Sequence, residues 1–340
     1  MKKSASLNSF SRLAAIGLVA AALPAHHALA ADWKPTRPVE FIVTAGPGGG
    51  TDQFARVVQS VVQKYKLMPS AVVVTNKSGG AGTEGLIYAK GAKGDPHKLV
   101  FSTNLAYLMP MITKVGYSID DLTPVAIMAA DEFILWSNAD GPYKTAKDLI
   151  AAAKAKNGGF KMGGAQSKDT DHILTRQIEK ATGAAMTYVP FKSGGEVAVQ
   201  LAGGHVEANT NNPSENISHW RAGKVRPLCV FAKQRMPIKE KVTADMGWGD
   251  IPTCKEQGIA IEEFRMPRTV WAAGEIAPEQ AAYWRNLMAQ VREKPEFKEW
   301  LSKGLQSDMF LTGAELARYI ANDKTSHKVQ FSQDGWLLKD

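Results

Sequence analysis

One stretch, residues 39–65, constrains the fold more than any other part of this chain. It begins with an apolar and partly β-branched run at 39–45, which predicts a buried strand. A glycine-rich segment, 46–52, follows, and apolar residues then recur at helical spacing as far as Tyr65. The sequence therefore predicts a strand, a glycine loop and a helix in direct succession.

Such a loop is typical of an anion site, with a purely structural turn as the alternative. Glycines let ligand oxygens approach main-chain N–H groups, and the helix start, capped here by Thr51 or Asp52, adds unpaired donors and partial positive charge. The loop lacks the Gly-Lys-Ser/Thr ending of a nucleotide-binding loop, and Asp52 would repel a polyphosphate. A small carboxylate therefore fits the loop better than a nucleotide.

Residues 1–30 have the features of an export signal. Lys2, Lys3 and Arg12 form a basic start, an apolar run follows, and residues 28–30 give a small-x-small cleavage site after Ala30. The apolar run is too short to span a bilayer, and no cysteine follows the cleavage site. We therefore expect an exported, soluble protein without a direct membrane anchor.

The net charge and the cysteine content limit the classes of partner and the covalent links that we expect. The net charge is +8, and three of those charges leave with the signal, so the mature chain is near +5. No Lys/Arg-rich run with interleaved aromatic residues occurs, so a nucleic-acid partner is not expected. The chain has two cysteines, Cys229 and Cys254, which in an exported protein form either a disulfide or two buried thiols.

Strand and helix signals alternate along the chain, which predicts an α/β fold with mainly parallel sheets. A second unit begins near Asn138 and has its own glycine loop, and we expect the chain to return to the first unit with the strand at 227–231. The predicted division is 31–137 and 228–340 for lobe 1, and 138–227 for lobe 2.

Two other motifs have structural explanations, and the common hydrolase motifs are absent from the sequence. Residues 80–85 fit G-x-G-x-x-G, but no acidic residue ends a strand about twenty residues later, so a tight turn is favoured over a dinucleotide site. Asp169, Asp171 and His172 are typical of a helix start, and His172 or Asp171 is a better candidate for contacting an organic ligand than for binding a metal. No G-x-S-x-G or S-x-x-K motif occurs, so no catalytic residue and no cofactor are predicted.

Taken in order, the motifs resemble those of the Bug receptors, the periplasmic substrate-binding proteins of tripartite tricarboxylate transporters. The resemblance covers essentially the whole mature chain, and the ordered set rather than any one motif is specific. It rests on the segments 47–52, 76–85, 117–125, 188–195, 201–206, 221–226 and 251–253.

This resemblance implies a two-lobed, type II-like periplasmic binding protein whose lobes close on a small carboxylate and whose partners are membrane transporter subunits. It also implies a monomer in the periplasm that is not an enzyme. Polar residues at strand ends, where open α/β sheets bind ligands, complete the predicted site. The predicted ligand-binding residues are Gly46, Pro47, Gly48, Gly49, Thr51, Asp52, Ser102, Thr103, Asn104, Gly164, Ala165, Gln166, Ser167, Asp171, His172, Phe191, Asn211 and Asn212.

Two departures from the family pattern bear on the ligand. Phe191 stands where relatives often have tyrosine, and residues 209–212 lack the acidic residue that many relatives carry near this strand end. An amino-acid ligand needs such an acid for its ammonium group. We therefore expect a di- or tricarboxylate, aromatic dicarboxylates included, with a sensor-kinase receptor and an exported enzyme as the alternative functions.

Overall fold

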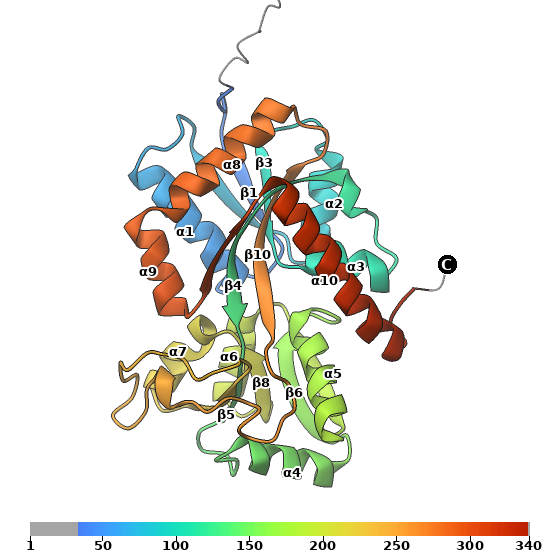
Figure 1. Ribbon diagram of the computed structural model, residues 1–340, viewed down its shortest axis with the longest axis vertical. Coiled ribbons are helices and arrows are strands. Elements are labelled where there is room, and N and C mark those ends of the chain that lie inside the picture. Colours follow the sequence, from blue (N-terminus) through green and yellow to red (C-terminus); the bar gives the residue numbers. More distant parts are fainter. Residues whose placement is uncertain (1–32, 339–340) are drawn as a thin grey trace, which may run out of the picture. The chain divides into compact units, whose positions relative to one another are not determined.

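Two β-sheets organise the chain, which is described here by a computed structural model (Figure 1). The structure describes residues 33–338, which belong to one unit that begins at Trp33. The predicted export signal, 1–30, and its cleavage after Ala30 lie outside the described residues. The two-lobed α/β architecture that the resemblance implied is confirmed.

The first sheet has six strands in the order β11-β4-β10-β3-β1-β2. Side chains alternate along β1, so that Phe41 and Val43 join one hydrophobic cluster with α1, α8 and α9, whereas Ile42 joins another with α2, α3 and α10. Helices therefore cover both faces of this sheet. The strands are β1 (Val39–Val43), β2 (Val72–Asn76), β3 (Lys98–Ser102), β4 (Leu122–Glu132), β10 (Arg265–Ala273) and β11 (Ser307–Leu311). The helices are α1 (Gly50–Lys64), α2 (Thr83–Gly91), α3 (Leu105–Ile112), α8 (Pro278–Arg292), α9 (Pro295–Gly304) and α10 (Gly313–Gln333).

The second sheet has five strands in the order β7-β6-β8-β5-β9. Trp136 of this sheet packs edge-on against Trp220 and Trp248, which lie before and after the last strand of the sheet in the sequence. The strands are β5 (Ile134–Asn138), β6 (Phe160–Ala165), β7 (Met186–Phe191), β8 (Ala208–Asn211) and β9 (Val225–Val230). The helices are α4 (Ala146–Lys156), α5 (Thr170–Thr182), α6 (Gly194–Ala202) and α7 (Pro213–Arg221), and short 3-10 turns lie at Ile119–Asp121 and Trp248–Asp250.

Both sheets are mixed, so the expectation of mainly parallel sheets is wrong. The β1–β2, β1–β3, β6–β7 and β6–β8 pairs are parallel. Every pair that involves β4, β5 or β10 is antiparallel. The reason is that β4, β5 and β10 belong to the segments that connect one sheet to the other, and they enter each sheet against the direction of its βα units.

The second sheet also takes in more of the chain than the expected segment 138–227. The strands at 134–138 and 225–230 both pair within it, although most of their residues were assigned to lobe 1. The segment after β9 stays with this sheet, because Thr253 bridges Val230, and the chain returns to the first sheet only at Arg265. Local strand signals could not show this, since sheet membership depends on long-range pairing. The lobe boundaries themselves remain a prediction.

Cys229 and Cys254 form a disulfide, which the sequence left open. Cys229 lies in β9 and Cys254 follows the bridge between Thr253 and Val230. The amide of Cys254 also donates to the carbonyl of Val230 at 2.9 Å. The disulfide therefore fixes the segment after β9 against the edge of the second sheet.

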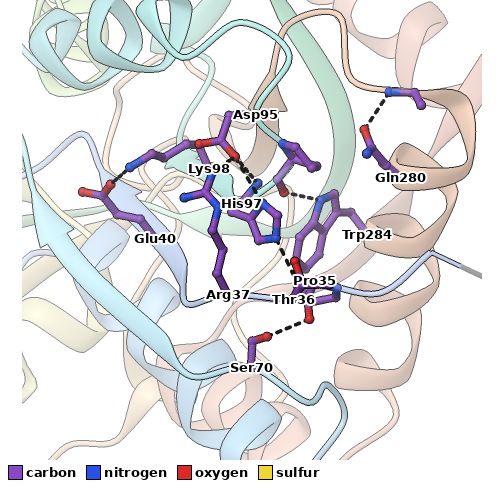
Figure 2. A network of polar contacts seen from close by, with 12 residues as sticks. Pro35, Thr36, Arg37, Glu40, Ser70, Asp95, His97, Lys98, Gln280 and Trp284 are labelled. Carbon is purple, nitrogen blue, oxygen red and sulfur yellow. Dashed lines mark hydrogen bonds and ion pairs between the residues drawn. The ribbon is translucent and has the colours of Figure 1, made fainter.

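A polar network ties down the start of the described chain (Figure 2). Asp95 accepts from Arg37 at 2.7 Å, and the amide of Thr36 donates to Nε2 of His97 at 3.3 Å. Trp284 of α8 donates to the carbonyl of Pro96 at 2.9 Å. Residues 36–37 and 95–97 lie just before β1 and β3. The network therefore fixes the amino ends of these two strands, opposite to the glycine loop, and joins them to α8.

The second glycine segment, residues 79–82, is a tight βα turn. Gly82 has φ +84° and is the N-cap of α2, and a Cβ there would lie 2.6 Å from the carbonyl oxygen of Thr44. This close approach is a structural reason for the G-x-G-x-x-G pattern. Within residues 33–338, no helix combines the length and apolar character that crossing a membrane requires.

Candidate functional site

A pocket of about 40 Å³ lies where the glycine loop after β1 meets the start of α5, α6 and α7. It takes residues from the carboxyl ends of strands in both sheets, which is where open α/β folds bind ligands. Its volume as it stands accommodates only a few water molecules. Its lining residues are Thr44, Ala45, Gly49, Gly50, Thr51, Thr103, Leu105, Ala165, Gln166, Asp169, Thr170, Asp171, Ser193, Gly194, Asn212, Glu215, Met266 and Arg268.

A larger hollow of about 660 Å³ is lined by residues of α7, α9 and the segment around Trp248. Its lining includes Ser214 and Gln53, which are sequence neighbours of residues in the smaller pocket. None of its lining residues belongs to the glycine loop after β1, to the glycine loop after β6 or to the carboxyl end of a strand. The smaller pocket is therefore the better candidate for a specific ligand site.

The first glycine loop is shaped by Asp52, but not as a helix cap. The N-cap of α1 is Gly49, which has no side chain to accept a bond, so the expectation that Thr51 or Asp52 is the cap is wrong. Asp52 is instead the third residue of the helix and accepts from the amide of Gly48 at 3.0 Å and from Arg56 at 2.9 Å. Asn76 donates to its other oxygen at 3.0 Å.

These bonds decide the charge of Asp52. Burial acts to raise the pKa of its carboxyl, but the bonds from Arg56, the Gly48 amide and Asn76 outweigh burial, and the pKa is lower than usual. Asp52 does not line the pocket. The carboxylate therefore holds the loop from the side away from the pocket lining.

Glu215 supplies a carboxylate at the pocket end of α1. It lies in the first turn of α7, and its Oε1 accepts from the amide of Gly50, the first residue of α1, at 2.7 Å. Burial raises the pKa of Glu215 to about 7, although Arg268 and the Gly50 amide act to lower it. A carboxylate from the second lobe thus already occupies one main-chain donor that the loop was predicted to offer.

Arg268 connects the two sides of the pocket. This buried residue of β10 makes a bidentate ion pair with Asp131 of β4, with Nε 3.0 Å from Oδ1. Its Nη1 donates to Oγ1 of Thr51 at 2.8 Å, and its Nη2 donates to Oδ1 of Asn212 at 3.1 Å. A Cβ on Gly50 would lie 2.1 Å from Nη2 of Arg268, so only glycine fits there.

The start of α5 adds two buried carboxyl groups. Asp169 is the N-cap and accepts from the amide of Thr170 at 2.7 Å, and Asp171 accepts from the amide of Ala165 at 2.6 Å. Burial raises the pKa of Asp169 to about 6 and that of Asp171 well above its usual range, where Glu215 adds to the effect. A Cβ on Gly164 would lie 2.7 Å from Cβ of Asp171, which explains the glycine at this position.

Direct contacts join the glycine loop after β1 to the loops after β6 and β7. The side chain of Gln166 donates to the carbonyl of Thr44 at 3.1 Å. The amide of Gly46 donates to the carbonyl of Lys192 at 3.3 Å. Together with the bond between Gly50 and Glu215, these contacts hold the pocket closed.

Seven of the predicted ligand residues line this pocket, and they come from both glycine loops and from the ends of β3 and β8. They are Gly49, Thr51, Thr103, Ala165, Gln166, Asp171 and Asn212. The other predicted residues lie outside the lining and are Gly46, Pro47, Gly48, Asp52, Ser102, Asn104, Gly164, Ser167, His172, Phe191 and Asn211.

His172 illustrates why some predicted residues are not in the lining. Its ring stacks on Tyr188 at 4.0 Å, meets Trp336 edge-on, and accepts from the amide of Lys168. Burial lowers the pKa of His172 to about 4, so it is neutral at pH 7. In the part of the chain that the structure describes, no group of three or more His, Cys, Asp or Glu side chains is placed to hold a metal ion.

The absence of an acidic residue at 209–212 does not leave the pocket without acids. Asp169, Asp171 and Glu215 all line it, although no acidic residue occurs at 209–212. Glu215 lies three residues beyond that strand end, and its place in the first turn after Asn-Pro was the available signal. Arg268 was missed as well, since a charged residue inside the apolar strand 265–273 could have been recognised only as a buried partner for Asp131.

Comparisons with known proteins agree with this architecture. A family model described as the tripartite tricarboxylate transporter family receptor, TctC, matches residues 54–333. BugT of Bordetella pertussis is 30% identical over 233 residues, which are 67% of this chain and 71% of that protein. A Cupriavidus necator protein named for the gbd 5' region is 27% identical over 316 residues, covering 93% of this chain and 91% of its own.

Solved structures show the same fold. The periplasmic binding protein BugD has a TM-score of 0.80 at 20% identity, covering 90% of this chain and all of that one (100%). MatC from Rhodopseudomonas palustris, solved with malate, has a TM-score of 0.75 at 18% identity, covering 86% of this chain and 98% of its own. An R. palustris protein solved with adipate has a TM-score of 0.80 at 22% identity, covering 89% and 99%. With the family model spanning most of its length, this chain belongs to the TctC receptors of tripartite tricarboxylate transporters, the periplasmic solute-binding family that includes the Bug proteins.

Proposed function

We propose that this protein captures a small organic acid in the periplasm and delivers it to the membrane subunits of a tripartite transporter. The acid binds in the pocket between the glycine loop after β1 and the glycine loop after β6. The observation that carries the proposal is the convergence of α1, α5 and the strand ends of both sheets on one pocket. Helix N-termini and glycine loops favour a carboxylate there. In this proposal the receptor acts as a monomer and catalyses no reaction.

The start of α1 supports binding of a carboxylate. The Gly50 amide already donates to the carboxylate of Glu215 at 2.7 Å, so the position suits a carboxylate oxygen. The next amide, that of Thr51, has no hydrogen-bond acceptor among residues 33–338. A ligand carboxylate that replaced Glu215 would therefore find two adjacent main-chain donors.

The ligand enters only if the pocket opens. A volume of about 40 Å³ is too small for an organic acid, and the bonds from Gly50 to Glu215, from Gln166 to Thr44 and from Gly46 to Lys192 must break. We expect the opening to occur at the two segments that connect the sheets, 132–134 and 231–265. The solved relatives with malate and adipate place dicarboxylates first in the ligand panel, with tricarboxylates and monocarboxylates next.

A thermal-shift screen against organic acids tests the proposal, since a ligand that binds only the folded state raises the melting temperature. An acid is expected to raise the melting temperature by several degrees when its matching amide does not. Scattering should then show a smaller radius of gyration with the acid than in the open, ligand-free protein. Uptake of that acid by cells with and without the protein tests delivery.

A matched pair of variants localises the binding. Gly50→Ala places a Cβ against Arg268 and should abolish most of the shift, whereas Gly91→Ala on α2 meets no atom within 4 Å and should leave it unchanged. Circular dichroism checks that both variants fold. The proposal is overturned if no acid in the panel raises the melting temperature, or if Gly50→Ala retains the full shift.

A further inference from the structure

We infer that the ligand carries an ammonium group in addition to its carboxylate, and that Glu215, Asp169 and Asp171 bind this group. The inference rests on the proposed function and narrows its substrate class from organic acids in general to amino acids and related zwitterions. It replaces the expectation of a di- or tricarboxylate without a positive charge.

The ionisable groups that line the pocket are mainly acidic. Three lining residues have carboxyl groups, Asp169, Asp171 and Glu215, and only Arg268 has a cationic side chain. Arg268 is already paired with Asp131, so it offers little net positive charge to a ligand. A dicarboxylate would add two negative charges to a pocket in which acidic groups already outnumber basic ones.

Hydrogen-bonding capacity points the same way. Nε, Nη1 and Nη2 of Arg268 already donate to Asp131, Thr51 and Asn212. Among the carboxyl groups, Asp169 accepts through Oδ1 and Asp171 accepts through Oδ2. The second oxygen of each carboxyl has no hydrogen-bond donor among residues 33–338. Unused acceptors match the three N–H donors of an ammonium group, which a carboxylate lacks.

Energetics explain why a cation would be favoured. Burial takes hydration from these three carboxyl groups, and Arg268 and the amide donors offset only part of that cost, so the pKa values of the carboxyl groups stay raised. Such groups are typical of functional sites. The charges that act on the pKa of Glu215 include Arg268 on β10 and Asp131 on β4, and the charge of Glu215 in turn raises the pKa of Asp171 on α5. The same arginine lowers the pKa of Asp169, and the charge of Asp169 helps to raise the pKa values of the Tyr117 and Tyr188 hydroxyls. A cation placed among these acids would add an attraction that the paired Arg268 supplies only in part.

The two ligand classes predict opposite proton exchange. Burial raises the pKa of Glu215 to about 7 and that of Asp169 to about 6, so part of this acidic cluster carries protons at pH 7. An ammonium favours the ionised carboxylates and releases those protons. An acid without a cation favours the protonated carboxyls and takes protons up. The sign of the proton exchange therefore separates the classes.

Isothermal titration calorimetry at pH 7, in phosphate and in Tris, measures that sign. The probes are pairs that differ only in the amino group, namely alanine with propionate, 4-aminobutyrate with butyrate, and glutamate with glutarate. For at least one pair, the amino acid is expected to bind at least tenfold more tightly than its partner and to release protons.

Two variants assign the effect to the pocket. Glu215→Gln should reduce the preference for the amino acid at least threefold and should reduce the proton release, whereas Glu279→Gln, an exposed acid on α8, should change neither. Tighter binding of the acids without nitrogen, with proton uptake, overturns the inference and leaves the proposed function standing. The absence of binding across the whole panel of acids overturns both.

Discussion

Asp52 and Glu215 occupy equivalent positions in two helices that begin at the pocket, α1 and α7, and their surroundings are opposite. Each lies at the third helical residue, where an acidic side chain suits the helix dipole. Asp52 is held by Arg56, Asn76 and the Gly48 amide, and its pKa is lowered. Glu215 reaches across to Gly50 of the other helix, and its pKa is raised to about 7.

The difference teaches that position in a helix does not determine what an acidic residue does. Asp52 folds back on its own loop and has a cation of its own, so it stabilises the loop. Glu215 points toward the other lobe, where the nearby Arg268 is already paired with Asp131, so its carboxyl is available to a ligand. Three sets of variants test this contrast between a structural acid and a binding acid.

The largest effect is expected from the two arginines. Arg268→Met leaves Asp131 buried without its partner and should lower the free energy of unfolding by about 3–5 kcal/mol. Arg56→Met breaks a pair whose arginine is 51% exposed and should cost at most about 1 kcal/mol. Urea unfolding of both variants measures the difference, and equal costs would show that the buried pair has no special role.

The next effect concerns pH. The pKa of Glu215 in the folded protein, about 7, lies above its ordinary value of 4.5. The folded state therefore holds a proton that the unfolded state loses, and the contribution of Glu215 to stability falls as pH rises from about 4.5 to 7. Between pH 4.5 and pH 8, the free energy of unfolding of Glu215→Gln should therefore rise by on the order of 1–3 kcal/mol relative to that of the wild type.

Asp52 has the opposite sign, because its lowered pKa makes its stabilising contribution fully present above pH 4 and lost only as pH falls below it. Unfolding of the wild type and Glu215→Gln at pH 4.5 and pH 8, with Glu279→Gln as the control, checks the comparison. A free-energy difference between wild type and Glu215→Gln that does not change with pH would mean that folding does not raise the pKa of Glu215.

The smallest effect is expected at Asp52 itself. Asp52→Ala removes the acceptor for Arg56, Asn76 and the Gly48 amide and should cost about 1–2 kcal/mol. Asp52→Asn keeps an oxygen for the Gly48 amide, so it should cost less and retain ligand binding. Melting temperature and affinity are measured together. Lost affinity in Asp52→Asn at an unchanged melting temperature would make Asp52 a direct ligand contact.

Much of the architecture could be predicted from local patterns. The run at 39–45 and the helical spacing after it predicted β1 and α1, since burial on a sheet and on a helix face leaves distinct periods. The glycine loops were recognised because positive φ angles and close approach demand glycine. Positions such as Thr51, Thr103 and Gln166 followed from their place at strand and helix ends, and all three line the pocket.

The remaining features depend on which distant segments meet. No local pattern shows that β5 and β9 join the second sheet, that Arg268 of β10 pairs with Asp131 of β4, or that Glu215 reaches Gly50. The sequence by itself determined the βα units, the glycine loops and the family. The tertiary structure alone decided the charge of the pocket, because a carboxyl group changes from a structural to a binding residue according to the cations, amides and solvent that the fold places around it.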